Sequence, residues 1–152
     1  MTWWRRDQFA LRRPRLLARN AVLAALRRWF AEEGFIEVET PALQVSPGME
    51  VHLKAFATEI EEPFADRNRR LYLHTSPEFA MKKLLAAGET RIFQFARVFR
   101  NGERAATHHP EFTMLEWYRA DADWSALITD CEGILRTALG AAPASLSTGA
   151  LR

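Results

Sequence analysis

The fold of this chain is decided by residues 97–118, RVFRNGERAATHHPEFTMLEWY. This stretch reads as two strands joined by a long polar loop. The first strand ends at Arg100, and the second returns through Glu111, Glu116 and Tyr118. An arginine, two carboxylates and a phenol on one hairpin can form a site for a small zwitterion and a phosphate, because the planar guanidinium matches carboxylate and phosphate oxygens.

The return strand carries an acid among bulky side chains. Side chains alternate across a strand, so Glu116 shares one face with Phe112 and Met114. A purely structural hairpin explains the two apolar residues as core, but it explains Glu116 less well, because an unpaired buried carboxylate is costly. Glu116 is therefore either a residue of an exposed face or a partner for a buried cation.

Other polar residues of the hairpin also have structural explanations. A lone arginine such as Arg100 most often forms a surface salt bridge. His108 and His109 are adjacent in the loop, and neighbouring side chains rarely point at one ion. No ladder of Cys, His and Asp accompanies them, so we expect no metal site on this hairpin.

The segment Thr75–Glu78 joins an expected strand to the start of an expected helix. Backbone N–H groups at such a helix start favour anions. Thr75 can cap the helix together with Glu78, and Pro77 is tolerated in its first turn. Glu78 either completes this capping box or reaches outward to bind an ammonium group, and local chemistry alone leaves both alternatives open.

The composition is that of a soluble globular protein. The 152 residues are 48% hydrophobic and 26% charged, and the net charge of +2 does not demand a nucleic-acid partner. Cys131 is the only cysteine, so no internal disulfide forms and a cytoplasmic location is expected. No apolar run approaches transmembrane length, and we expect no membrane association.

Positive charge is concentrated near the N-terminus. The basic residues there are Arg5, Arg6, Arg12, Arg13, Arg15 and Arg19. We expect residues 1–15 to form a basic N-terminal arm. Such an arm is either a binding element for an acidic partner or RNA, or a solvated, partly disordered segment.

Apolar periodicity predicts the remaining elements. Expected helices cover residues 16–33, residues 75–87 and a stretch from 124 to about 139, with Gly34 and Gly88 as terminators and Asp123 as a cap. Expected strands cover residues 35–40, 51–58, 71–74, 92–100 and 111–119, with a loop over 61–70. The last helix carries an apolar stripe formed by Trp124, Leu127, Ile128, Cys131, Leu135 and Leu139.

Three stretches together resemble the class II aminoacyl-tRNA synthetases of the lysine type. FRNGE followed by HHPEFTMLEWY resembles their motif 2. LARNAVLAALRRWFAEEGFIEVETPAL, residues 17–43, resembles motif 1, and LHTSPEFAMKKLLAAG, residues 73–88, resembles the amino-acid-binding segment between them. The order and spacing fit the lysyl-tRNA synthetases and their short paralogues, the elongation factor P (R)-β-lysine ligases.

This resemblance implies an α+β fold, a class II synthetase-like antiparallel sheet flanked by helices. It also implies that residues 16–152 form a partial catalytic domain with motifs 1 and 2. The glycine-rich motif 3 of the family has no counterpart after Tyr118, so we expect the fold to be incomplete at its C-terminal end. Motif 1 begins too early for a preceding OB-fold domain, which favours the ligase paralogues over the synthetases.

The resemblance also implies roles for individual residues. Arg100 takes the catalytic position that contacts the ATP α-phosphate and the substrate carboxylate. The expected ATP-binding residues are Arg100, Asn101, Gly102, Glu103, His109 and Phe112, with Phe112 stacking on adenine. The expected substrate-binding residues are Ser76, Pro77, Glu78, Glu116 and Tyr118. The family commonly has an acid at the place of Gly102 and asparagine at the place of His109, so the adenine contacts differ here.

The implied reaction activates lysine or (R)-β-lysine with ATP and Mg²⁺ and transfers the acyl group to a lysine of elongation factor P. Motif 1 implies a homodimer, and no Mg²⁺ ligands are expected in this chain, because the family holds the metal with acids near motif 3. Two alternatives stay open. One is a lysyl-tRNA synthetase fragment, with tRNA as the less favoured acceptor. The other is a non-catalytic module that dimerises or binds lysine-like ligands.

A first prediction follows from the missing motif 3. We expect the 152-residue chain alone to show weak or absent adenylation, because the sequence lacks the second clamp on ATP. ATP–pyrophosphate exchange with lysine and with (R)-β-lysine measures this step directly. Robust exchange by the purified chain would contradict the expectation.

Overall fold

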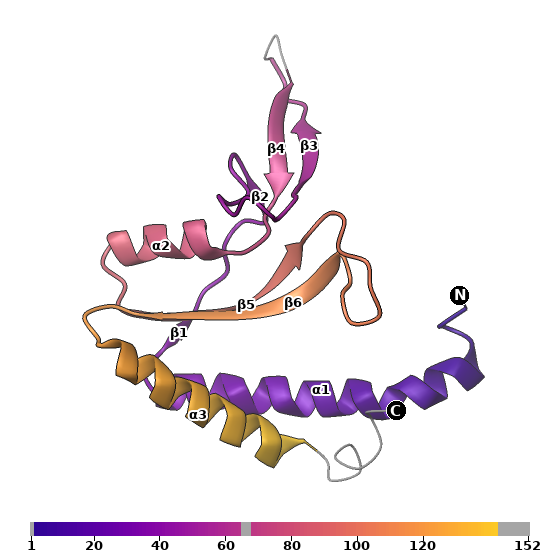
Figure 1. Ribbon diagram of the computed structural model, residues 1–152, viewed down its shortest axis with the longest axis vertical. Helices are drawn as coiled ribbons and strands as arrows, with labels where there is room; N and C mark the ends of the chain where they lie inside the picture. The colour runs from indigo at the N-terminus through magenta and orange to yellow at the C-terminus, as the bar shows by residue number, and fades with distance from the viewer. Residues whose placement is uncertain (1, 65–67, 143–152) are drawn as a thin grey trace. The chain divides into compact units, whose positions relative to one another are not determined.

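A computed structural model describes residues 2–64 and 68–142 of the chain. Within them it has three helices and two three-stranded sheets, which confirms the expected α+β class (Figure 1). Contacts divide the chain into two units, which we describe separately. The helical unit comprises the described residues up to Phe35 and from Ala122 onward, and the sheet unit comprises Ile36–Asp121.

The first helix of the helical unit is longer than expected. Helix α1 spans Arg6–Glu32 and contains Pro14, so the predicted start at residue 16 is wrong by ten residues. Residues 6–15 are exposed throughout. Because this part of the helix buries no face, its sequence lacks the apolar stripe that predicted the rest of the helix. The predicted end is confirmed, since Gly34 has φ 76° and its N–H donates to the carbonyl of Ala31.

Helix α3, Trp124–Ala141, is the second helix of this unit and packs against α1. The predicted cap is confirmed, because the Asp123 carboxylate accepts a hydrogen bond from the N–H of Ser125 at 2.9 Å. Gly133 faces α1, and a Cβ built on it would lie 2.5 Å from Cζ2 of Trp29. The absence of a side chain at this position therefore allows the two helices to approach closely.

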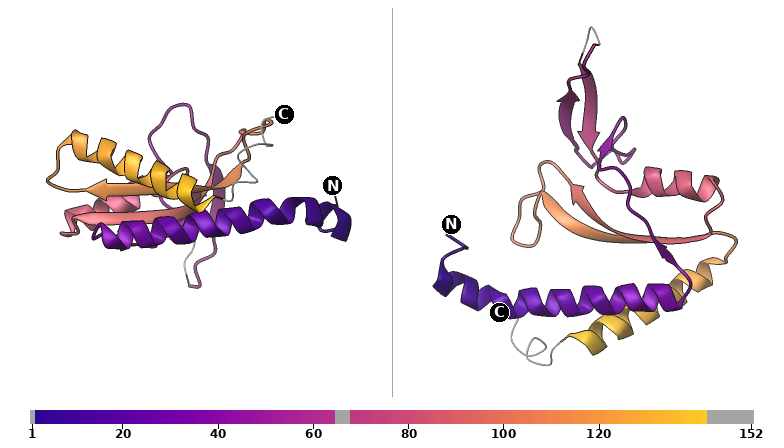
Figure 2. Two further views of the ribbon diagram at one scale, coloured as in Figure 1. Left: turned by 90° about the horizontal axis from the view of Figure 1, so that it is seen from below. Right: turned by 180° about the vertical axis from the view of Figure 1, so that it is seen from behind.

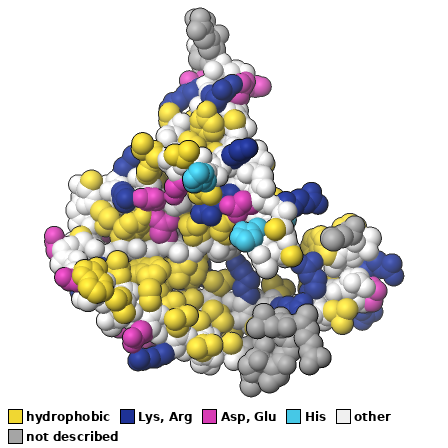
Figure 3. Space-filling model, viewed as in Figure 1, with side chains coloured by type: hydrophobic (Ala, Val, Ile, Leu, Met, Phe, Trp, Pro, Cys, Tyr) yellow, Lys and Arg dark blue, Asp and Glu magenta, His cyan; other side chains and the backbone are white. Residues whose placement is uncertain are grey.

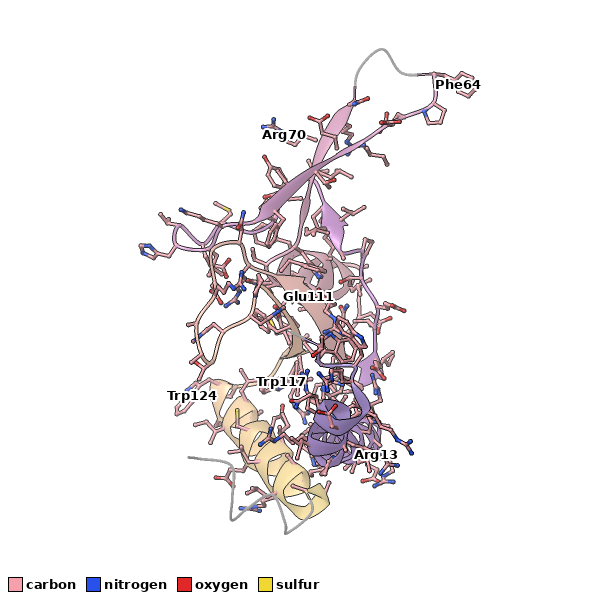
Figure 4. All side chains as sticks on the ribbon, turned by 90° about the vertical axis from the view of Figure 1, so that its right-hand side faces the viewer. Arg13, Phe64, Arg70, Glu111, Trp117 and Trp124 are labelled. Carbon is pink, nitrogen blue, oxygen red and sulfur yellow. The ribbon has the colours of Figure 1, made fainter. Side chains whose placement is uncertain are left out.

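The apolar stripe predicted on this helix does not form a buried face. Trp124 is 71% exposed and Leu139 is 75% exposed, and the residue that α3 buries is Asp130. Hydrophobic side chains accordingly show on the face of α3 in Figure 3, and Trp124 extends away from the helix in Figure 4. The stripe is exposed because the helix turns its glycine side, and not its apolar side, toward α1.

The first sheet of the sheet unit is built on the predicted hairpin. Strands β5, Arg91–Phe99, and β6, Glu111–Arg119, pair antiparallel from Arg91↔Arg119 to Phe99↔Glu111. The predicted strand at 35–40 is reduced to β1, Ile36–Glu37, which pairs parallel with β5. Strand β5 supplies the core of the unit, with Ile92, Phe93, Ala96 and Val98 all buried.

The second sheet has the strand order β2-β4-β3 and is antiparallel. Its strands are β2, Leu43–Gln44, β4, Arg69–Leu73, and β3, Phe56–Ile60, so β3 lies a few residues later than expected. Helix α2, Glu78–Ala86, follows β4 and lies along one side of the β5–β6 hairpin in Figures 1 and 2. No helix in the described part of the chain is long and apolar enough to cross a membrane.

A second prediction tests the contact between α1 and α3. We expect Gly133→Ala to destabilise the protein by about 1–3 kcal/mol, because the new methyl group overpacks against the rigid indole of Trp29. Gly140→Ala in the same helix is the matched control, since nothing lies within 4 Å of its Cβ position. The control should gain about 0.5–1 kcal/mol from helix propensity. Urea denaturation measures both changes, and equal free energies of unfolding for the two variants would contradict the close packing.

Candidate active site

The carboxylate of Glu116 is the centre of a hydrogen-bonded cluster in the sheet unit. It accepts from the Ser76 hydroxyl at 2.7 Å and, through its other oxygen, from the Tyr118 hydroxyl. Burial and the adjoining Glu116 carboxylate raise the pKa of Tyr118 well above its ordinary value, so the phenol stays protonated and donates. Glu116 is thus half-buried with two neutral donors, and not with the buried cation considered from the sequence.

Ser76 holds the predicted substrate-binding residues at Thr75–Glu78, called the substrate segment below, to this cluster. The Ser76 hydroxyl accepts from the N–H of Glu78 at 3.1 Å while it donates to Glu116, so it joins the start of α2 to β6. The predicted capping by Thr75 is wrong, because the buried Thr75 hydroxyl instead donates to the carbonyl of Pro47 at 3.0 Å. Pro47 belongs to the loop after β2, Leu43–Gln44.

Glu78 does not form a capping box either. Its carboxylate accepts from the ammonium group of Lys82, one turn further along α2, at 2.5 Å. The hydrogen bond and the charge of Glu78 raise the pKa of Lys82 above its ordinary value, with a smaller contribution from Glu116. Acidic and basic side chains accordingly lie next to one another on the face of the sheet unit drawn in Figure 3.

Arg100 lies just after β5 and is held on two sides. Its Nε donates to the carbonyl of Thr75 at 3.3 Å, and its guanidinium lies over the ring of Phe112, 5.3 Å from the centroid. Nη1 is 3.8 Å from the Glu103 carboxylate. The structure therefore brings together three of the predicted ATP-binding residues, and it joins them to the substrate segment through the backbone of Thr75.

The other predicted ATP-binding residues are Asn101, Gly102 and His109, and the contacts of Asn101 and His109 are made with backbone groups elsewhere. The N–H of Asn101 donates to the carbonyl of Lys54 at 2.6 Å, and Gly102 has φ 86°, a region that favours glycine. Nδ1 of His109 lies 2.9 Å and 3.2 Å from the backbone oxygen and nitrogen of Glu111. The imidazole therefore lies against the start of β6, where Glu111 is labelled in Figure 4.

Sequence reasoning missed His74, which is 2% exposed and lies between β4 and the substrate segment. Its Nε2 is 2.7 Å from the carbonyl of Arg97, and its backbone oxygen accepts from the N–H of Phe99 at 3.1 Å. Because a carbonyl only accepts, Nε2 carries the proton. Nδ1 is buried and has no hydrogen-bond partner in the described structure. A polar residue ending an apolar strand, directly before Thr75–Glu78, was the signal available for a link between β4 and β5.

Comparison with known proteins identifies the class. Residues 5–147 match the family described as "tRNA synthetases class II (D, K and N)", and the chain belongs to this family. The match includes the hairpin and the substrate segment, so the expected family is confirmed.

Individual relatives within the family are more specific. The chain is 47% identical over 133 residues to the "Elongation factor P--(R)-beta-lysine ligase" of Histophilus somni, covering 88% of this chain and 41% of that protein. The ligases of Haemophilus ducreyi and Pasteurella multocida are 48% and 47% identical over 128 residues, covering 84% of this chain and 39% and 40% of theirs. The chain thus spans about 40% of the length of these relatives.

A third prediction tests the bond between Tyr118 and Glu116. We expect Glu116→Gln to lower the pKa of Tyr118, because the neutral amide no longer repels the phenolate. Alkaline titration followed by phenolate absorbance at 295 nm measures the shift. Tyr118→Phe is the control and should remove the affected component. Superimposable curves for wild type and Glu116→Gln would mean that the two side chains are not in contact.

Proposed function

We propose that this chain supplies the lysine-binding part and a share of the ATP-binding part of a ligase that activates lysine or (R)-β-lysine with ATP and passes the acyl group to a lysine of elongation factor P. The names of its relatives describe such ligases. The observation that carries the proposal is the cluster of Ser76, Glu116 and Tyr118 beside Glu78. Two carboxylates in one cluster are the complement of a substrate with two ammonium groups, such as lysine or (R)-β-lysine.

The hydroxyl donors prepare Glu116 for this role. Ser76 and Tyr118 each donate one hydrogen bond to the carboxylate and fix the directions of its remaining lone pairs. Because both donors are neutral, they leave the negative charge of Glu116 uncompensated. That charge is then available to a substrate ammonium group, while Glu78, Ser76 and Pro77 line the side of the substrate nearer to α2.

Arg100 belongs to the ATP side of the proposed site. Bound ATP supplies an activated α-phosphorus that the substrate carboxylate attacks, a step that depends on positioning and charge neutralisation. With Nε anchored on Thr75 and Nη1 3.8 Å from the Glu103 carboxylate, the terminal N–H groups of Arg100 can contact a phosphate and a carboxylate once the long contact with Glu103 is exchanged for them. The ring of Phe112 contacts one face of the guanidinium and would supply an aromatic surface next to it for adenine. The loop residues Asn101, Gly102, Glu103 and His109 would complete the nucleotide contacts.

Magnesium is implied by the family but is not matched by this part of the site. No group of three or more His, Cys, Asp or Glu side chains that could hold a metal ion exists among residues 2–64 and 68–142. Arg100 would supply one positive charge beside the phosphate, and Mg²⁺ would supply further charge neutralisation there.

We further propose a homodimer formed through the motif 1 region, α1 with β1, and a cytoplasmic location. The exposed Leu16 and Leu17 of α1 support the dimer, because an interface would cover apolar side chains of this kind. The single cysteine is consistent with a reducing compartment. Multi-angle light scattering of the purified chain distinguishes monomer from dimer.

A fourth prediction concerns the two carboxylates. We expect Glu116→Ala and Glu78→Ala each to weaken binding of a lysine analogue about tenfold or more, because each removes a charged hydrogen-bond partner. Isothermal titration calorimetry measures the affinities, and Glu59→Ala on the exposed face of β3 is the control. Unchanged affinity in both site variants would rule out the lysine pocket. In a separate experiment, transfer assays with elongation factor P and with tRNA as acceptors would distinguish the ligase from the synthetase alternative.

A further inference from the structure

Lys82 already occupies the position that the proposed function gives to a substrate amine. Its ammonium group lies 2.5 Å from the Glu78 carboxylate. The family resemblance implies that Glu78 lies near the α-amino group of the substrate. An ordinary i,i+4 ion pair on a helix surface explains the contact structurally. That explanation does not account for the position of the ion pair. The pair lies at the end of α2 that Ser76 joins to Glu116.

The charges of this cluster differ from those of the ligand. Glu78 and Glu116 contribute two negative charges and Lys82 contributes one positive charge, while Tyr118 stays neutral. A lysine-like ligand brings two ammonium groups. The Lys82 ammonium group is bonded to Oε1 of Glu78, so a second substrate ammonium group that approaches Glu78 meets the positive charge of Lys82 and competes with it for this carboxylate.

We propose that Lys82 determines specificity by occupying Glu78 until the second ammonium group of the substrate displaces it. This inference rests on the proposed function of the site. Displacement is feasible because the Lys82 side chain is 55% exposed and exposed ion pairs of this kind are weak. The side chain also lines a pocket between α2 and residues 44–46, which gives it a second place to lie.

The consequence is that Lys82 weakens the binding of only one of the two ammonium groups. A ligand with a terminal ammonium group but no α-amino group binds at Glu116 and leaves the pair of Glu78 with Lys82 intact. A ligand with both groups must break that pair. Lys82 therefore lowers the advantage of the diamine over the monoamine.

The test compares lysine with 6-aminohexanoic acid, which lacks the α-amino group. We expect Lys82→Met to strengthen lysine binding about fivefold, the factor that one unit charge exerts at about 4 Å in water, and to leave 6-aminohexanoic acid within about twofold. The ratio of the two dissociation constants, measured by calorimetry on the full chain, should rise accordingly. Lys82→Arg keeps the charge and should keep the wild-type ratio.

Lys83→Met is the matched control. Lys83 is the next residue of α2 and lines the same pocket, but it has no ion pair among the described residues. It should leave the ratio unchanged, and thermal melts should confirm that all variants fold. A fall in lysine affinity or an unchanged ratio in Lys82→Met overturns the role of Lys82 alone. Absence of lysine binding in both wild type and Lys82→Met overturns the proposed function together with it.

Discussion

The hydroxyl of Ser76 is the contact on which the candidate site depends. It accepts from the start of α2 and donates to Glu116 on β6, so one atom fixes the helix and the strand relative to each other. A half-buried carboxylate needs such donors, because leaving it without partners would cost more than the bonds return. Once Glu116 is held, Tyr118 is held through it, and the substrate segment acquires a defined distance from the hairpin.

The hairpin and its acids could be predicted from the sequence because their signals are local. Alternation over residues 92–100 and 111–119 identified both strands, and Asp123, Gly34 and Gly88 marked helix ends through their own backbone or side-chain chemistry. The family resemblance then placed Arg100 and Phe112 together, and the structure shows the guanidinium over that ring. The individual strands and helix ends are each decided within a few residues of the chain, whereas the contact of Arg100 with Phe112 was anticipated only through the family resemblance.

The features that could not be predicted depend on what each face meets in three dimensions. The start of α1 has no buried stripe to mark it, and the stripe of α3 was visible in the sequence without any sign that it stays exposed. Thr75 fits the capping pattern, but the carbonyl of Pro47, 28 positions away, takes its hydroxyl. His74 likewise bonds to a strand 23 positions away. Residue spacing alone does not predict whether a side chain forms its hydrogen bond with a local or a distant partner.

Arg100 shows how one side chain can serve both halves of the site. Its Nε is committed to the backbone of Thr75, and that residue directly precedes Ser76, the residue that holds Glu116. A movement of the substrate segment must therefore move the guanidinium, and a ligand that pulls on the guanidinium must pull on the segment. Phe112 covers one face of the guanidinium, and the planar fork matches the geometry of phosphate and carboxylate oxygens.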